Sequence, residues 1–351
     1  MQNIFIGNPE FNISNQTVEA SCPSNIALIK YWGKYENQIP ANPSISYTLN
    51  HCRTNTVMTF FAGEDFSVQT FLAGNAEVQF AQKIEKYFKS IQQYLPWILQ
   101  GRYVISTENT FPHSSGIASS ASGFGAIAKC LMNLDEEFSG ILSAEDKSKK
   151  ASFLARLGSG SACRSLYNGL IVWGNTKEVV GSSDEFAVPF PNDEIHEIFK
   201  DFNDWVLLIH EGQKSVSSTV GHGLMNTNPY AERRFQEAHE NFTVLKDILK
   251  TGDMDAFIKL VEHEALTLHA MMMMSDPAFI LMKTGTLEVI HKLWDFRKET
   301  GLPLFFTLDA GANVHLLFPN HPKIDTIKSF IETDLLPHTQ KGGIVKDTMN
   351  F

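Results

Sequence analysis

The chain has only four cysteines, and none of them is spaced as in a metal or redox site. Cys22, Cys52, Cys130 and Cys163 are scattered over 351 residues, without a CxxC or CxxxxC pattern. Structural zinc sites use closely spaced cysteine pairs, and small disulfide-stabilised domains contain a higher density of cysteines. We therefore expect four free, buried thiols.

Positive charge is also scarce. The chain has 29 Lys and Arg against 39 Asp and Glu, which gives a formal net charge of −10. This balance argues against nucleic acid or an anionic membrane surface as a partner. An anionic small-molecule substrate would need cations that are placed locally.

Long apolar runs are missing as well. No run reaches the length of a membrane span, and residues 1–7 lack the basic segment and apolar core of a signal peptide. We therefore expect a cytoplasmic protein without a membrane partner. Hydrophobic residues make up 43% of the chain and aromatic residues 11%, which is enough for the core of one large or two medium domains.

Three common catalytic motifs are absent, namely GxxxxGK(S/T), GxSxG and HExxH. A P-loop, a serine hydrolase elbow and a zincin site are therefore not supported. His263 and His269 stand near Glu264, but a spacing of six residues puts the two histidines roughly 120° apart around a helix. We reject a metal site there, and residues 271–274, four consecutive methionines, are more typical of core filling.

Residues 111–125 combine glycine and small hydroxyl residues at the expected start of a helix. The first turn of a helix presents unpaired N–H groups and the positive end of the dipole, beside which serine hydroxyls can bind phosphate or magnesium. The segment therefore predicts an anion-binding loop. A serine-rich N-cap that only allows close packing is the alternative, and this segment alone does not exclude it.

Three other segments place reactive side chains beside turns. Gly158 and Gly160 allow close backbone approach, and Arg164 offers a planar fork for a carboxylate or phosphate. Cys163 stands where GxGxxG requires its last glycine, so a dinucleotide fingerprint is not supported. Asp309 follows a strand-like run and precedes a glycine, where an acid can be either a turn residue or a catalytic group. In the third segment, Lys30 and Lys34 flank the aromatic residues Tyr31 and Trp32 and the glycine at position 33.

The hydrophobic pattern predicts a strand-rich first half and a helix-rich second half, divided within residues 181–192. Helices are expected at 76–95 and 117–134, and three more between 229 and 300, with breaks near 251–253 and 275–277. Residues 135–150 are expected to be a charged loop, 22–25 a turn and 62–65 a hairpin turn. Strands are expected at 17–21, 26–31, 44–49, 54–61, 66–72, 103–107, 169–173, 204–210, 302–308 and 314–318.

Taken together, residues 24–34, 112–123, 158–166 and 309–313 resemble, in this order, the signature segments of the mevalonate diphosphate decarboxylase family. This family is part of the GHMP kinase superfamily, and the similarity runs from about residue 17 to about residue 335. The segments "NIALIKYWGK" and "GSGSACRSL" are the most specific, whereas the loop at 112–123 resembles all GHMP kinases.

The resemblance implies an α+β fold of the GHMP-kinase type. Residues 1–190 would form a ribosomal-protein-S5-like lobe with the phosphate-binding loop, and residues 191–351 a ferredoxin-like lobe, with the active-site cleft between them. It also implies that ATP and Mg²⁺ are used to phosphorylate the 3-hydroxyl of mevalonate 5-diphosphate. Loss of that phosphate with CO₂ then gives isopentenyl diphosphate. We also expect a homodimer.

Matching positions imply a role for each site residue. The catalytic residues would be Asp309, which orients the hydroxyl and accepts its proton, Arg164, which binds the substrate carboxylate, and Lys30, which lies near the phosphates. The substrate-binding residues would be Tyr31, Lys34, Ser159, Ser161 and Arg164. The nucleotide-binding residues would be Ser114, Ser115, Gly116, Ser119 and Ser120, with Ser120 also the magnesium ligand.

The chain departs from the family pattern at three places. Ala312 stands where the family usually has Pro, Pro43 where it has Ser, and His113 begins a segment that replaces Thr-Ala-Ala. Related enzymes act on mevalonate 5-monophosphate or stop at 3-phosphorylation, and both remain alternatives. A non-catalytic ATP sensor is a further alternative, although a sensor needs no base such as Asp309.

Overall fold

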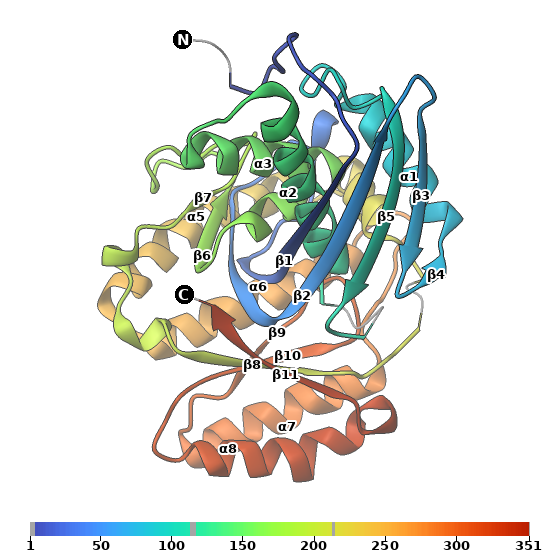
Figure 1. The fold of residues 1–351 in the computed structure, drawn as a ribbon. Coiled ribbons are helices and arrows are strands. Elements are labelled where there is room, and N and C mark those ends of the chain that lie inside the picture. The colour runs from blue at the N-terminus through green and yellow to red at the C-terminus, as the bar shows by residue number, and fades with distance from the viewer. Residues whose placement is uncertain (1–3, 113–116, 213–214, 351) are drawn as a thin grey trace.

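The computed structural model describes residues 4–112, 117–212 and 215–350. Within these ranges the strands form an 11-stranded sheet in the order β4-β3-β5-β2-β11-β8-β10-β9, with β1 and β6 paired to β2 and β7 paired to β6 (Figure 1). The first half contains β1 (Gln16–Ile29), β2 (Ser44–Ala62), β3 (Ser67–Leu72), β4 (Asn75–Ala76), α1 (Val78–Ser90), β5 (Gly101–Asn109), α2 (Ser119–Ser139), α3 (Ala144–Gly158), β6 (Leu170–Trp173) and β7 (Val188–Pro189). The second half contains β8 (Phe202–Leu207), α4 (Ser218–Leu224), α5 (Ala231–Thr251), α6 (Met254–Met273), α7 (Thr284–Thr300), β9 (Phe305–Thr307), β10 (Val314–Pro319), α8 (Ile324–Phe330) and β11 (Ile344–Asn350).

The predicted turn at residues 22–25 is wrong. β1 continues through this segment and pairs with β2 along its length, with an irregularity in register between Pro23 and Asn25. Proline cannot donate a ladder hydrogen bond, and an irregular position in a strand is one of the few places that tolerate it. The two strands predicted at 44–49 and 54–61 are likewise one strand, β2.

The predicted hairpin at residues 62–65 is also wrong. β5 lies between β2 and β3, and it pairs antiparallel with β2 but parallel with β3. A parallel neighbour needs a crossover connection, which here contains α1. The residues of a turn do not indicate whether a later strand, here β5, is inserted between the two strands that the turn connects.

Residues 135–150 are helical rather than a loop, because α2 continues to Ser139 and α3 begins at Ala144. The charged residues were misleading because some of them are buried and paired. Lys150 Nζ lies 3.0 Å from Asp135 Oδ2, and Asp135 also accepts a 2.8 Å hydrogen bond from the indole of Trp97. Ser143 caps α3 by accepting a hydrogen bond from the Asp146 N–H.

Helices α5 and α6 join the two halves of the chain. Their apolar faces contribute to one core with β1, β2 and β8, in which Leu28, Phe202, Phe242 and Phe257 are all buried. Helices α7 and α8 cover the β8–β10 strands in the lower part of Figure 1. The break predicted near 251–253 is confirmed, since Gly252 ends α5 in a left-handed conformation.

The prediction of four free, buried cysteines is confirmed. The methionine prediction is half right: Met271 and Met272 are buried, whereas Met273 and Met274 are 40% and 47% exposed. No helix in the described ranges combines the length and apolar character needed to cross a bilayer.

Candidate active site

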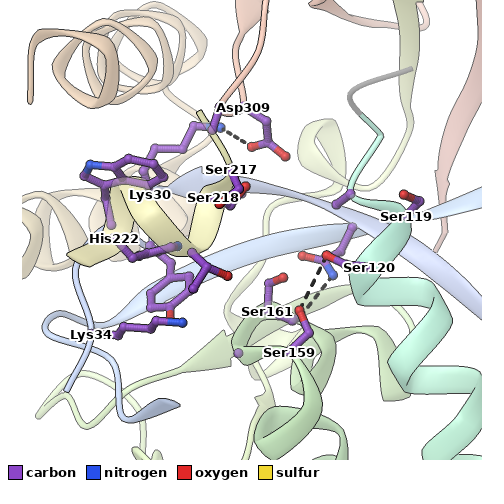
Figure 2. A pocket seen from close by; sticks show the side chains of 18 of the residues that line it. Lys30, Lys34, Ser119, Ser120, Ser159, Ser161, Ser217, Ser218, His222 and Asp309 are labelled. Carbon is purple, nitrogen blue, oxygen red and sulfur yellow. Dashed lines mark hydrogen bonds and ion pairs between the residues drawn. The ribbon is translucent and has the colours of Figure 1, made fainter. Parts of the chain in front are cut away.

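A cavity of about 620 Å³ lies where the end of β1, the start of α2, the end of α3, helix α4 and the β9–β10 loop meet (Figure 2). Every predicted site residue in the described ranges lines it, although the four segments are far apart in the sequence. These residues are Lys30, Tyr31, Lys34, Ser119, Ser120, Ser159, Ser161, Arg164 and Asp309. Ser114, Ser115 and Gly116, together with His113, lie outside the described residues.

Lys30 and Asp309 form an ion pair at one side of the cavity. Lys30 Nζ lies 3.3 Å from Asp309 Oδ1, and the lysine side chain is 2% exposed against 27% for the aspartate (Figure 2). Burial lowers the pKa of Lys30, and this effect is opposed by the negative charges of Asp309 and Glu264. The carboxylate of Asp309 therefore faces the cavity while a buried cation supports it from behind.

Arg164 lies in a buried 3-10 turn at Gly160–Leu166. Its Nη1 donates to Ser44 Oγ and its Nε donates to Asn25 Oδ1 at 3.3 Å. Asn25 is in turn held by Ser165, to whose Oγ it donates at 2.7 Å. The guanidinium thus has a fixed orientation at the cavity wall, which suits recognition of a planar anion.

The start of α2 presents two serines to the cavity. The N-cap of α2 is Ala118, which makes no side-chain capping bond, so the alternative of a serine N-cap is wrong in this helix. Ser119 and Ser120 are its first residues, and Ser120 Oγ accepts a 3.5 Å hydrogen bond from Ser159 Oγ. The hydroxyls are therefore available to a ligand beside the positive end of the helix dipole.

The glycines between α3 and the 3-10 turn are required by close contacts. A Cβ atom on Gly158 would lie 2.0 Å from the ring of Phe124, and one on Gly160 would lie 2.8 Å from both Trp173 and the Tyr31 hydroxyl. Larger residues at either position would clash with these side chains. The prediction of close backbone approach is confirmed at both positions.

Tyr31 has a buried hydroxyl for which the described residues supply no hydrogen-bond partner. Its ring packs against Trp173 and His222, with centroids 4.6 Å and 4.3 Å away. Burial raises the pKa of Tyr31 well above its usual value, so the group remains a hydroxyl donor. An unpaired buried donor is costly, and a ligand oxygen would satisfy it.

Several lining residues were not among the predicted site residues. His222 on α4 accepts a 3.0 Å hydrogen bond from the Gly33 N–H through Nδ1, and burial, with a smaller effect of Lys34, lowers its pKa to about 3. The ring is therefore neutral, with its proton on Nε2. Lys83 reaches the cavity from α1. Lys83 carries no sequence signal, because it lies in an ordinary amphipathic helix, whereas His222 follows the hydroxyl-rich run at residues 215–219. Ser217, Ser218 and Thr219 also line the cavity.

The cavity has the opposite charge balance to the chain as a whole. Among its described lining residues, Lys30, Lys34, Lys83 and Arg164 are basic and Asp309 is acidic. The expectation that an anionic substrate needs locally placed cations is met at this site. Burial and the neighbouring charge of Lys83 both lower the pKa of Lys34, which indicates a cluster of cations without enough anions.

Comparisons with known proteins agree with this geometry. Residues 22–187 match the family described as "Diphosphomevalonate decarboxylase-like N-terminal domain", and residues 205–350 match "Mevalonate 5-diphosphate decarboxylase C-terminal domain". The diphosphomevalonate decarboxylase of Schizosaccharomyces pombe is 30% identical over 318 residues, which cover 85% of this chain and 77% of the relative. The human diphosphomevalonate decarboxylase is 26% identical over 332 residues, covering 90% and 78%.

Solved structures give the same result. The mevalonate diphosphate decarboxylase from Staphylococcus aureus has a TM-score of 0.81 and 30% identity, with 96% of each chain covered. A protein called MDDEF, solved in complex with MVAPP, AMPPCP and magnesium, has a TM-score of 0.80 and 28% identity, covering 96% of this chain and 98% of that one. The expected α+β fold of the GHMP-kinase type is confirmed. The chain belongs to the mevalonate diphosphate decarboxylase family.

Proposed function

We propose that this protein catalyses the ATP-dependent decarboxylation of mevalonate 5-diphosphate to isopentenyl diphosphate, with ADP, phosphate and CO₂ as the other products. The observation that carries the proposal is the Lys30–Asp309 pair, which shares one cation-lined cavity with Arg164 and the serines of α2. The diphosphomevalonate decarboxylases to which the chain is similar support the reaction type. The reaction is a step of the mevalonate pathway.

Asp309 receives the proton of the 3-hydroxyl. A tertiary alcohol is hardly ionised at neutral pH, so its proton leaves late, as phosphoryl transfer with a loose transition state permits. Lys30, 3.3 Å from Asp309 Oδ1, holds the carboxylate in place and offsets charge near the transferred phosphate.

Arg164 holds the substrate carboxylate until it leaves. In the second step the C3–O bond breaks and its electron pair departs with the phosphate, while the C1–C2 pair forms the C2=C3 double bond and C1 leaves as CO₂. Because Ser44 and Asn25 fix the guanidinium, the carboxylate has a defined orientation relative to C3. Tyr31, Lys34, Ser159 and Ser161 bind the remaining oxygens of the substrate.

The nucleotide phosphates bind at the start of α2, beside Ser119 and Ser120, the second of which accepts a hydrogen bond from Ser159. Magnesium fits this donor set. The described part of the chain contains no cluster of three or more His, Cys, Asp or Glu that could hold a metal. An ion here would therefore take most of its ligands from phosphate oxygens and water, with Ser120 as the protein ligand, as Mg²⁺ does in phosphate sites. When bound, Mg²⁺ offsets phosphate charge.

The test is a coupled assay with ATP, Mg²⁺ and either mevalonate 5-diphosphate or the 5-monophosphate, in which ADP and CO₂ are measured together. Equal amounts of ADP and CO₂ with the diphosphate support the proposal. Turnover with the monophosphate alone would indicate a different substrate, and ADP without CO₂ would indicate a 3-kinase. ATP binding without any turnover would indicate a sensor.

We also propose a cytoplasmic homodimer in which residues 1–190 and 191–351 form the two lobes. Four free, buried thiols suit a reducing compartment. The dimer and the lobe boundary are expectations from the family resemblance. Light scattering on the purified protein measures the mass of the assembly, and limited proteolysis locates the boundary.

A further inference from the structure

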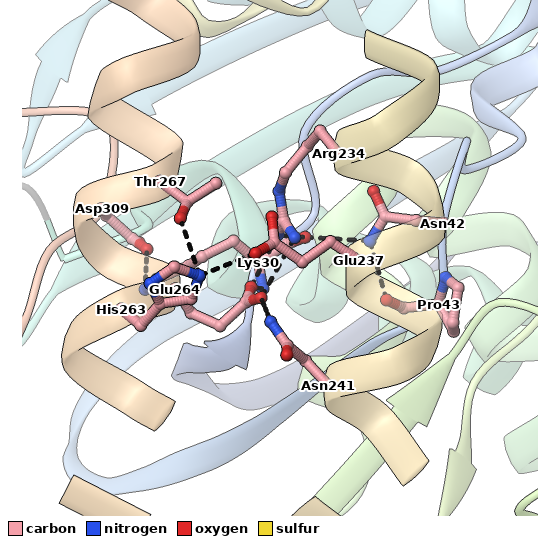
Figure 3. Close-up of polar contacts among 10 residues, drawn as sticks. All are labelled: Lys30, Asn42, Pro43, Arg234, Glu237, Asn241, His263, Glu264, Thr267 and Asp309. Carbon is pink, nitrogen blue, oxygen red and sulfur yellow. Dashed lines mark hydrogen bonds and ion pairs between the residues drawn. The ribbon is translucent and has the colours of Figure 1, made fainter. Parts of the chain in front are cut away.

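Lys30 follows directly after the last residue of β1, so its main-chain groups have left the sheet. Side chains form hydrogen bonds with both the N–H and the carbonyl of Lys30. The Lys30 N–H donates to Glu264 Oε2 at 2.9 Å, and the Lys30 carbonyl accepts from Asn42 Nδ2 at 3.0 Å and from Arg234 Nη2 at 3.4 Å. Figure 3 shows these side chains converging on Lys30 from α5, α6 and the segment before β2.

Glu264 and Arg234 are themselves a buried ion pair between α6 and α5. Arg234 donates to the carboxylate through Nη1 at 3.0 Å and through Nη2 at 2.6 Å. The two side chains are 0% and 1% exposed, and Asn241 donates a further 2.6 Å bond to Glu264 Oε1 (Figure 3).

Stability alone does not account for this pair. Buried ion pairs often contribute no more than apolar side chains of the same volume, because both charges lose their hydration. The pair is also incompletely satisfied, since the described residues supply no partner for Arg234 Nε. What an apolar replacement could not do is accept the Lys30 N–H and donate to its carbonyl.

We propose that Glu264 and Arg234 are positioning residues that fix the main chain of Lys30, so that its ammonium group meets Asp309 in the cavity. This role rests on the proposed function, in which Lys30 supports Asp309 during phosphoryl transfer. Neither Glu264 nor Arg234 lines the cavity, so they act through Lys30 and not on the substrate. Small displacements of a catalytic group are costly, about 10²-fold in rate for 1 Å.

The decisive variant is the double substitution Arg234→Met/Glu264→Leu. It removes both charges together, so it leaves no lone charge in the core, and it deletes the acceptor for the Lys30 N–H. We expect a folded protein with kcat reduced about 10–100-fold. Binding of a non-hydrolysable ATP analogue should stay within about twofold, since the nucleotide site at α2 is not changed.

A second double variant, Arg234→Met/Glu264→Gln, separates the hydrogen bond from the charge. The amide oxygen of glutamine can still accept the Lys30 N–H, so we expect kcat to recover to within about fivefold of the parent.

The charged groups that face Lys30 are Asp309 from the β9–β10 loop, Glu264 from α6, Arg234 from α5 and Arg164 from the 3-10 turn. Glu264 raises the pKa of Lys30. Both double variants should therefore lose the charged Lys30, and with it kcat/KM, at lower pH than the parent.

The matched control is Glu237→Gln/His263→Gln. His263 Nε2 lies 2.8 Å from Glu237 Oε1, so this pair also joins α5 to α6, but it is at the surface, with the His263 side chain 53% exposed (Figure 3). Its kcat should stay within about twofold of the parent. Folding of all variants is checked by thermal unfolding and circular dichroism.

Unchanged kcat in the folded Met/Leu variant would overturn the positioning role, as would equal losses in the Met/Leu and Met/Gln variants. If the Met/Leu variant does not fold, Asn42→Ala removes an uncharged donor to the same Lys30 carbonyl. Reduced kcat with normal nucleotide binding would then support the role, and unchanged kcat would overturn it. Failure of the proposed function can be distinguished from failure of the positioning role. If the proposed function is wrong, the parent protein itself forms no ADP with mevalonate 5-diphosphate.

Discussion

Asp309 is the residue on which the proposed chemistry depends most. A turn residue and a catalytic base make opposite predictions for Asp309→Asn, because Asn is a good turn residue but cannot accept the hydroxyl proton. The ion pair with Lys30 Nζ, on a side chain that is only 2% exposed, favours the catalytic role.

We expect Asp309→Asn to form ADP roughly 10²–10⁴-fold more slowly than the parent, the range for loss of a general base. Affinities for ATP and for mevalonate 5-diphosphate should change only a few-fold. Rapid-quench measurement of ADP and calorimetric titration of both ligands provide the two readouts. Near-normal ADP and CO₂ formation would exclude a role for Asp309 in proton transfer.

At the cavity wall, Arg164→Lys tests the carboxylate clamp. Lysine has no planar fork and cannot keep both the Ser44 and Asn25 bonds while it binds a carboxylate. We expect substrate binding to weaken by about 1.5–3 kcal/mol, while ATP affinity is nearly unchanged. Equilibrium titrations with each ligand make the comparison. An equal loss of nucleotide affinity would instead assign Arg164 to the ATP site.

At the scale of single elements, α2 and α3 use serine at their starts in different ways. Ser143 caps α3 through a hydrogen bond to the Asp146 N–H, whereas α2 is capped by Ala118 and its serines face the cavity. Serines at the two helix starts therefore predict opposite effects of removing a hydroxyl.

Ser120→Ala should lose about 2–4 kcal/mol of transition-state stabilisation, seen as reduced turnover at saturating ATP, with an unchanged melting temperature. Ser143→Ala is its control. It should lower the free energy of unfolding by about 1 kcal/mol with full activity. Full turnover by Ser120→Ala would contradict the assignment of this hydroxyl to the phosphates and magnesium.

Helix α4 is tied to the turn after β1 by His222, and this contact predicts an effect of pH on stability. Burial lowers the pKa of His222 to about 3, below the value of about 6.5 in an unfolded chain. The unfolded state therefore binds the proton more readily between these values. The stability from neutral His222 is present above about pH 6.5 and is lost as the pH falls, at up to about 1.4 kcal/mol per pH unit.

His222→Gln keeps an acceptor for the Gly33 N–H but does not titrate. Its free energy of unfolding should therefore fall less than that of the parent between pH 7 and pH 4.5, as measured by urea denaturation. Parallel pH dependence in the two proteins would show that His222 is not the group that titrates.

At the scale of the whole molecule, β11 links the two parts of the sheet. It pairs with β8 through residues 344–348 and with β2 through residues 349–350. Where the pairing of β2 with β1 shifts in register, between Thr48 and Arg53, the buried carboxylate of Asp347 accepts hydrogen bonds from the His51 and Cys52 N–H groups at 2.9 Å and 2.6 Å. The last strand of the chain thus satisfies main-chain N–H groups of β2 that do not pair with β1.

Asp347→Ala should lower the free energy of unfolding by about 2–4 kcal/mol, because it leaves the buried Cys52 N–H and the part-buried His51 N–H without this acceptor. Lys346→Ala removes a surface ion pair with Glu332 and should cost less than about 1 kcal/mol. Equal midpoints in urea for the two variants would show that the hydrogen bonds to Asp347 do not stabilise this part of β2.

Much of the fold was predictable because it is encoded in local patterns. The three helices between residues 229 and 300 follow from apolar periodicity and from breaks at Gly252 and Pro277. The insertion of β5 between β2 and β3 was not predictable from local patterns, because the neighbours of a strand in a sheet are selected by burial across the whole sheet. Residues 135–150 were predicted to be a loop because their charged residues have the same sequence pattern as a solvated loop, although Lys150 and Asp135 form a buried ion pair.

For the site, the sequence alone determined the residue types and their order: the lysines after β1, the serines at the start of α2, the glycines before Arg164, and Asp309 at a strand end. These are properties of short segments, in which a turn, a helix start or a charge is set by its neighbours in the chain. Only the tertiary structure decided that these segments meet in one cavity. It also revealed that His222 and Lys83 complete the cavity and that Glu264 and Arg234 hold Lys30. Glu264 and Arg234 lie in helices whose pattern is ordinary, and their contacts with Lys30 join segments about 200 residues apart in the chain, which no local signal records.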